Sequence, residues 1–202
     1  MRIRQVGANA LLLECADETQ VETWRAELLR RRAAGELAAV DIVPAARTVL
    51  VDGVPDPETA AQVIASWHPQ PDPDVSGGQL VQIPTVYDGE DLPTVADHWG
   101  ITTAEVIDRL SRAELRVAFC GFAPGFAYLI GVPGPAVPRL PSPRPRVPAG
   151  SVALAGPYAG IYPTASPGGW RLVGRTDVVL FDVRRDPPAL LTPGTRVRLV
   201  AA

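Results

Sequence analysis

Proline and glycine are concentrated in one part of this chain, and this pattern restricts its fold more than any other feature. Eleven of the 22 prolines and nine of the 18 glycines lie between Gly121 and Gly169. Both residues are favoured at turns, bulges and strand ends. Short β-prone segments occur around and after this region, namely VAFCGF, GSVALAG, WRLVGRT, VVLFDV and RVRLV. Many short strands separated by turn signals predict a β-barrel or a β-sandwich.

The first 68 residues have a different pattern, in which strand-like and helix-like segments alternate. Asp17 can cap a helix whose apolar residues Val21, Trp24 and Leu28 recur every three or four positions. Pro57 suits the first turn of a second helix. The predicted order is ββαββα, a sheet covered on one face by two helices. The predicted elements are strands Arg2–Val6, Ala10–Cys15, Val40–Val43 and Thr48–Asp52, and helices from Thr19 to Gly35 and from Pro57 onward.

A connector rich in proline, glycine, serine and aspartate separates the two halves of the chain. It covers residues 69–78, so we expect a small α/β domain at 1–68 and a β-barrel domain at 79–202. The second domain should start with a strand over Gln79–Tyr87 and a short helix over Asp91–Trp99. Another helix should begin at Thr102, with Glu105 completing a capping box. The predicted fold class is α+β.

Charge is strongly segregated along the chain. The segment from Leu115 to Thr176 has six arginines and no acidic residue, a formal charge of +6, whereas the remainder has thirteen arginines and twenty-two acids, or −9. This segregation predicts an anion-attracting surface, either a pocket for a carboxylate-like ligand or a docking face for an acidic partner. The net charge of −3 argues against a nucleic-acid-binding protein.

Several residue types needed for common chemistries are absent or isolated. The chain has no lysine, which excludes a Walker-A lysine and a Schiff-base lysine. His68 and His98 are the only histidines, and neither has a partner at metal-ligand spacing, so we expect no metal site. No apolar run approaches the roughly 20 residues of a membrane helix, and the start does not resemble a signal peptide. We therefore expect a cytoplasmic protein that does not contact a membrane.

The glycine-proline passages have two competing interpretations. Barrel corners need these residues for turns and bulges, but glycine also lets a ligand approach backbone amides closely. Phe122 and Phe126 alternate with glycine and proline, which places aromatic faces beside bare backbone. The loop Ser166–Trp170 can form an amide-lined concavity walled by indole. Arg144 lies between two prolines, and a stiffened arginine loses less entropy when it binds a carboxylate.

Three long passages in the second half carry a family resemblance. They are FCGFAPGFAYLIG from Phe119, PRPRVPAGSVALAG from Pro143 and GIYPTASPGGWRLVGRT from Gly160. Together they resemble the signature of the allophanate hydrolase subunit 1 family, of the carboxyltransferase subdomain C/D type, which includes the 5-oxoprolinase subunit PxpB and the histidine-kinase inhibitor KipI. The resemblance covers the whole chain. It implies a small N-terminal α/β domain followed by a cyclophilin-like β-barrel.

The positions that match the family's motifs supply the candidate ligand-binding residues. These are Phe122, Pro124, Phe126, Arg144, Ser151, Tyr162, Ser166, Gly168, Gly169, Trp170 and Arg175. Within this set, Arg144 and Arg175 are expected to hold a carboxylate or a phosphorylated intermediate. The amides of Gly168 and Gly169 are expected to serve as oxyanion donors. No catalytic residue is assigned.

Two positions depart from the family's pattern. Members often have a histidine where this chain has Leu110 or Ser111, and Gln-Thr where it has Tyr158–Ala159. If those polar groups contact substrate in relatives, this chain differs in substrate or has a regulatory role.

The acid-free segment also contains no histidine or lysine, so it can bind anions but is poorly equipped to catalyse hydrolysis alone. With the resemblance, this favours a subunit of an ATP-dependent 5-oxoprolinase-type amidohydrolase, which opens 5-oxoproline to L-glutamate only in complex. The implied partners are a subunit 2 (KipA/PxpC-type) homologue, a LamB/YcsF (PxpA-type) subunit and a small carboxylate or amide substrate, with ATP used by the complex. The alternatives are a KipI-like inhibitor of a sensor histidine kinase and a urea carboxylase- or allophanate-type carboxyltransferase module.

Overall fold

The computed structural model describes residues 1–70 and 78–202. The chain forms two compact units that divide between positions 77 and 78. Most of the predicted connector, residues 69–78, lies outside the described residues. Each unit has its own buried core, as expected for a domain.

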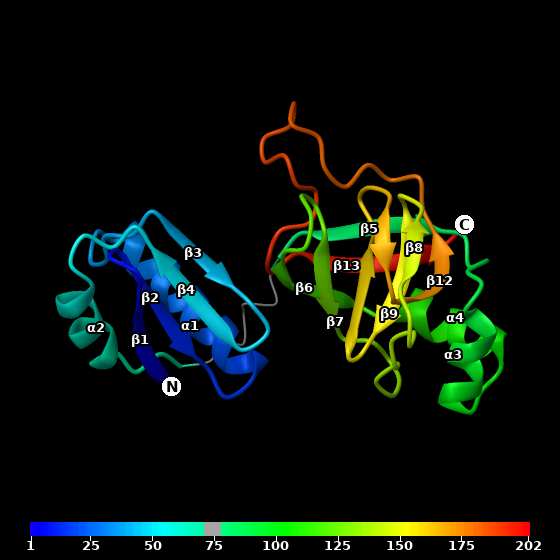
Figure 1. Ribbon diagram of the computed structural model, residues 1–202, viewed down its shortest axis with the longest axis horizontal. Helices are drawn as coiled ribbons and strands as arrows, with labels where there is room; N and C mark the ends of the chain where they lie inside the picture. The colour runs from blue at the N-terminus through cyan, green and yellow to red at the C-terminus, as the bar shows by residue number, and fades with distance from the viewer. Residues whose placement is uncertain (71–77) are drawn as a thin grey trace. The chain divides into compact units, whose positions relative to one another are not determined.

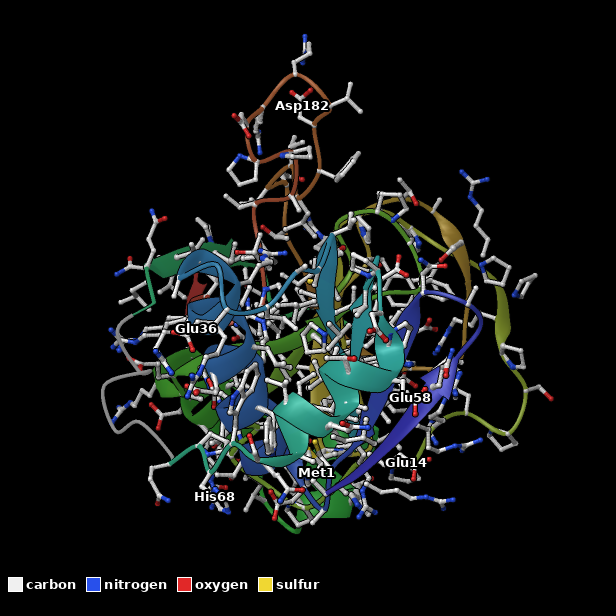
Figure 2. All side chains as sticks on the ribbon, turned by 90° about the vertical axis from the view of Figure 1, so that its left-hand side faces the viewer. Met1, Glu14, Glu36, Glu58, His68 and Asp182 are labelled. Carbon is white, nitrogen blue, oxygen red and sulfur yellow. The ribbon has the colours of Figure 1, made fainter. Side chains whose placement is uncertain are left out.

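The N-terminal unit is a four-stranded antiparallel sheet in the order β1-β2-β4-β3. Two helices cover one face of this sheet, and Figure 2 shows both of them on the same side. The elements are β1 (Arg2–Val6), β2 (Ala10–Glu14), α1 (Glu18–Ala33), β3 (Asp41–Pro44), β4 (Thr48–Asp52) and α2 (Pro57–Ala65). The predicted ββαββα order is confirmed.

Alternation of apolar and polar residues determines which face of this sheet the helices cover. Leu13 of β2 lies opposite Val49 of β4, and both side chains are fully buried. Leu28 of α1 and Ile64 of α2 belong to the same buried cluster. The carboxylate of Asp17 accepts a hydrogen bond from the amide three residues along and so caps α1, as predicted.

The C-terminal unit is a nearly closed, barrel-like sheet of seven strands in the order β12-β9-β10-β7-β6-β13-β5 (Figure 1). Val86, directly after β5, exchanges two backbone hydrogen bonds of 2.9 and 2.8 Å with Arg175 at the end of β12, which brings the two sheet edges together. The elements are β5 (Leu80–Thr85), α3 (Leu92–Trp99), α4 (Thr103–Arg112), β6 (Leu115–Cys120), β7 (Ala127–Ile130), β8 (Arg144–Val147), β9 (Ser151–Ala155), β10 (Tyr158–Ile161), β11 (Ser166–Gly168), β12 (Arg171–Arg175) and β13 (Arg196–Ala201). Strands β8 and β11 pair with each other in a separate two-stranded sheet. The predicted barrel and the α+β class are confirmed.

The two helices of this unit pack against the barrel strands. Val95 of α3 and Leu110 of α4 are fully buried in the same core as the strand residues. The capping box predicted at Thr102 and Glu105 is present, with reciprocal hydrogen bonds between the side chain of each residue and the backbone of the other. Within residues 1–70 and 78–202, no helix is both long enough and apolar enough to cross a membrane.

One predicted strand is wrong. The segment VVLFDV, residues 178–183, lies in a long loop between β12 and β13 that projects away from the barrel (Figure 1). Only Phe181 makes a β-bridge, to Ala189 in the same loop. Val179 and Val183 are exposed, whereas Leu180 is buried in the barrel core and Val178 packs against it, so part of the segment packs on the barrel without pairing as a strand. Backbone hydrogen bonds within the loop, such as that from Leu190 to the carbonyl of Leu180, replace pairing with the barrel.

Strand β9 is buried on both of its faces and separates two cores. Val152 and Leu154 belong to the barrel core, whereas Ala153 and Ala155 belong to a second cluster on the opposite face. Successive side chains of a strand point to opposite faces, so one buried strand serves both cores. The second cluster is mainly aromatic, and it forms the base of the candidate site.

Candidate functional site

A pocket of about 410 Å³ opens over this aromatic cluster. Its walls come from the turn after β6, the turn between β9 and β10, and the segment from the end of β10 to the start of β12. The lining residues are Phe122, Phe126, Tyr128, Arg139, Ala155, Gly156, Pro157, Tyr158, Tyr162, Pro167, Gly168 and Trp170. Segments that are distant in sequence therefore meet at one concave site.

Phe126 is the centre of the aromatic cluster. Its ring centroid lies 5.1 Å from that of Tyr128, 5.5 Å from that of Tyr162 and 5.5 Å from that of Trp170, each in an edge-to-face arrangement. Such pairs add stabilisation beyond the burial of their area. Phe126 is almost fully buried, so the cluster is a fixed wall rather than a mobile one.

Glycine allows these rings to lie directly on the backbone. A Cβ atom on Gly160 would lie 2.9 Å from Cζ of Phe126 and 3.0 Å from Cζ3 of Trp170. A Cβ atom on Gly168 would collide with the ring and hydroxyl of Tyr162. Aromatic rings therefore lie directly against bare backbone at these two positions.

Phe122 stands at the rim of the pocket in an unusual conformation. Its φ angle is 70°, in the left-handed region that non-glycine residues rarely adopt. Its side chain is 64% exposed, and its ring lies edge-on to Phe126 at 5.4 Å and to Tyr162 at 6.4 Å. Strained residues of this kind concentrate at ligand clamps and active sites.

Among the residues that the structure describes, Arg139 is the one charged residue that lines the pocket, and it is exposed to solvent. Within residues 1–70 and 78–202, its guanidinium has no carboxylate partner. Burial raises the pKa of the Tyr162 hydroxyl, while a hydrogen bond from the backbone of Trp170 and the positive charges of Arg139 and Arg144 act in the opposite direction. The pocket therefore combines apolar walls with one positive charge.

Arg144 does not line the pocket, because acidic residues hold it elsewhere. Its Nη2 lies 2.8 Å from Oδ2 of Asp91 and its Nε lies 2.6 Å from Oε1 of Glu90. Its Nη1 donates a 3.3 Å hydrogen bond to the carbonyl of Trp170. Arg144 thus holds the backbone at Trp170, directly before β12, and its charge is already balanced.

Three further groups are tied to the same acidic turn, residues 88–91. Asp91 is 5% exposed, and it accepts a 2.7 Å hydrogen bond from the amide of Leu172 and pairs with Arg171 at 3.3 Å. Arg175 pairs with Asp88 at 2.9 Å near the surface, away from the aromatic pocket. Three arginines of the acid-free interval, Arg144, Arg171 and Arg175, are therefore paired in space with acids that precede the interval.

The remaining predicted site residues also lie outside the pocket lining. Ser151 is buried in β9, and its carbonyl accepts a 3.0 Å hydrogen bond from the amide of Tyr162. The carbonyl of Gly169 accepts a 2.8 Å hydrogen bond from Leu140. The Ser166 hydroxyl is buried without a partner among the described residues, and Pro124 is exposed in the turn that carries Phe122.

The structure thus brings five of the predicted residues together at the pocket and leaves the other six around it. The five are Phe122, Phe126, Tyr162, Gly168 and Trp170. Sequence reasoning did not select Arg139, Tyr128 or Tyr158 as site residues. Arg139 and Arg144 both lie in proline-rich, acid-free sequence, and nothing local distinguishes them. Within residues 1–70 and 78–202 there is no cluster of three or more histidine, cysteine or acidic side chains that could hold a metal ion.

The chain belongs to the family described as carboxyltransferase domain, subdomain C and D, whose model matches residues 1–191. A 5-oxoprolinase subunit of Escherichia coli O157:H7 is 37% identical over 207 residues, which cover 96% of this chain and 93% of that protein.

Solved structures agree with this assignment. The crystal structure of TTHA0988 is 34% identical with a TM-score of 0.75, and the match covers 100% of this chain and 40% of that chain. The chain therefore spans well under half the length of this relative. Kluyveromyces lactis urea carboxylase has a TM-score of 0.74 at 20% identity, over 99% of this chain and 21% of that chain, which shows the shared fold alone.

Proposed function

We propose that this chain is one component of a 5-oxoprolinase-type, ATP-dependent amidohydrolase that is active only with its partner subunits. The E. coli relative, which matches over nearly its whole length, is named as a subunit of 5-oxoprolinase. A component of such a complex must bind a small cyclic amide or support a neighbour that does. The aromatic pocket is of a size that suits a small ligand.

The observation that carries this proposal is that the pocket has few side chains that could act as a general acid or base. Among the described residues, its lining has phenylalanine, tryptophan, three tyrosines, glycine, proline, alanine and one arginine, but no carboxylate, histidine or cysteine. Opening a lactam adds water to the carbonyl carbon, breaks the C–N bond and transfers a proton to the leaving nitrogen. An arginine can stabilise negative charge in such a reaction, but it does not exchange protons at neutral pH. A partner subunit would supply the acid and the base.

ATP fits this pocket poorly, which favours a nucleotide site on another subunit. A triphosphate carries several negative charges, whereas the lining offers one cation. The cations Arg144 and Arg171, which hold the backbone around Trp170 and Pro138, are already paired with Asp91. Lysine, which commonly binds the β- and γ-phosphates, is absent from the chain. ATP would energise the reaction at the level of the complex.

The partners proposed for this complex are a subunit 2 (KipA/PxpC-type) homologue and a LamB/YcsF (PxpA-type) subunit. We further propose that the complex works in the cytoplasm, where ATP is available.

The test is ATP hydrolysis measured with and without 5-oxoproline, first on the purified chain and then on the chain co-expressed with these two partners. We expect no activity from the chain alone and 5-oxoproline-dependent hydrolysis, with glutamate formed, from the assembled mixture. Size-exclusion chromatography of the same sample verifies assembly. An assembled mixture that forms no glutamate and shows no dependence on 5-oxoproline would refute the proposal.

A further inference from the structure

Arg139 is exposed to solvent, but the backbone around it is held in place on both sides. Val137 exchanges hydrogen bonds of 2.9 and 2.7 Å with Gly156, which itself lines the pocket. The amide of Leu140 donates a 2.8 Å hydrogen bond to Gly169, next to Trp170. The side chain of Arg171 also donates to the carbonyl of Pro138 at 3.2 Å. Arg139 is therefore anchored to the pocket wall from both directions.

Electrostatics makes Arg139 the point where an anion would bind. No negative residue lines the pocket, and Arg139 has no carboxylate partner among residues 1–70 and 78–202. The other arginines close to this region, Arg144 and Arg171, share Asp91. Arg139 is itself exposed to solvent, so its attraction for an anion gains strength only where a bound ligand and the apolar walls exclude water. The pocket is thus suited to a ligand with one negative charge.

The walls select for shape as well as charge. Phe122, Phe126, Tyr158, Tyr162 and Trp170 present ring faces and edges, which favour a flat or cyclic ligand over a flexible chain. A volume of about 410 Å³ is near the lower end of the range for small-molecule sites. Exposed Phe122 lies at the rim, where its ring can cover a ligand that enters.

We propose that this pocket binds a small ring compound with a single carboxylate, that Arg139 pairs with the carboxylate, and that the aromatic walls hold the ring. This proposal rests on the proposed function in one respect only. The proposed function identifies the ring as a lactam. It transfers the anion-binding role from Arg144 and Arg175 to Arg139. Arg139 is a specificity-determining residue in this scheme, and no bond is made or broken by it.

The experiment is a titration of the purified chain, and of the assembled complex, with three probes of similar size. 5-Oxoproline has the ring, the amide and the carboxylate; 2-pyrrolidinone lacks the carboxylate; cyclopentanecarboxylate lacks the amide. Calorimetry gives the affinity, and tryptophan fluorescence reports on Trp170 in the wall. A Trp170→Phe variant should lose the ligand-induced fluorescence change, which locates the ligand at this pocket.

The variants compared are Arg139→Gln and, as the matched control, Arg146→Gln. Arg146 is an exposed arginine of the same acid-free segment that does not line the pocket. We expect Arg139→Gln to weaken binding of 5-oxoproline about tenfold or more, since a charge-assisted hydrogen bond is lost. Arg146→Gln should bind like the natural chain, and 2-pyrrolidinone should bind weakly to all three proteins.

The outcomes separate this inference from the proposed function. Arg139-dependent binding of cyclopentanecarboxylate without binding of 5-oxoproline supports the carboxylate site and contradicts the 5-oxoprolinase assignment. Equal binding of 5-oxoproline by the natural chain and the Arg139→Gln variant overturns the role of Arg139 and leaves the assignment standing. Failure of both carboxylates to bind, to the chain and to the complex alike, overturns the inference.

Discussion

Two regions of the second unit use arginines from the same acid-free segment in opposite ways. At the acidic turn, residues 88–91, buried Asp91 pairs with both Arg144 and Arg171, and Glu90 also pairs with Arg144, so two negative charges balance two positive ones. At the aromatic pocket, Arg139 has no such partner among the described residues and faces apolar walls. An arginine's sequence context does not separate these cases. The separation depends on whether an acid from a distant part of the chain reaches it.

The largest effect is expected from removing the acid at the turn. Asp91→Ala should lower the free energy of unfolding by about 3 kcal/mol, because it leaves two half-buried arginines and the amide of Leu172 without their acceptor. The free energy of unfolding is measured by urea denaturation, with tryptophan fluorescence as the signal. Asp88→Ala is the control, since its pair with Arg175 is well exposed and should contribute less than about 1 kcal/mol. Equal effects of the two variants would contradict the distinction between a buried and an exposed pair.

The next effect concerns the packing of the pocket wall. Gly160→Ala should lower the free energy of unfolding by about 2 kcal/mol, because the added methyl group meets Phe126 and Trp170 in a close-packed cluster. Displacement of these rings should also abolish binding of the carboxylate probes. Gly121→Ala is the control, since a Cβ atom there meets nothing within 4 Å. If Gly160→Ala is as stable as Gly121→Ala, the wall is looser than the structure indicates.

A smaller effect, of opposite sign, is expected at the rim. Phe122→Gly should raise the free energy of unfolding by up to about 1 kcal/mol, because glycine adopts the left-handed conformation without strain and the lost ring is mostly exposed. The same change should weaken binding of 5-oxoproline about fivefold, through loss of an aromatic contact. Thermal unfolding and calorimetry give the two values. A decrease in both stability and affinity would mean that the ring has a mainly structural role.

The smallest expected effect is a change in the pKa of Tyr162, which is compared between variants of Arg139 and Arg146. The charge of Arg139 opposes the rise that burial imposes on the pKa of Tyr162, so Arg139→Gln should raise that pKa further. Arg146→Gln should leave it unchanged. The pKa of Tyr162 is measured by titrating tyrosinate absorbance. In each protein, the curve of the corresponding Tyr162→Phe variant is subtracted to isolate the signal of Tyr162. An unchanged Tyr162 pKa in Arg139→Gln would place the guanidinium in bulk solvent, away from the pocket.

Much of the fold could be predicted because local rules apply to it. The alternation that buries Leu13 and Val49, the cap at Asp17 and the capping box at Thr102 all depend on residues close in sequence. The strand predicted at residues 178–183 was wrong because its apolar residues have no partner strand, which sequence periodicity does not reveal.

The site was predicted less well than the fold. Phe126, Tyr162 and Trp170 meet at the pocket, as their glycine-rich surroundings suggested. Arg144 was selected for its stiff, proline-rich context, which it shares with Arg139. The acids that neutralise Arg144 lie more than fifty positions earlier in the chain. Only the tertiary structure, in which the acidic turn at residues 88–91 lies beside β12, shows that Arg144 is already paired with a carboxylate.

The sequence by itself determined the two-part organisation, the barrel, the aromatic character of the site and the absence of lysine chemistry, because composition and short-range patterns specify them. The tertiary structure decided which aromatic rings share one wall, which strand is buried on both faces and which arginine keeps an uncompensated charge. These features depend on contacts between distant segments. The energy of a charge is set by the groups that surround it in space, and its neighbours in sequence are only a few of those groups.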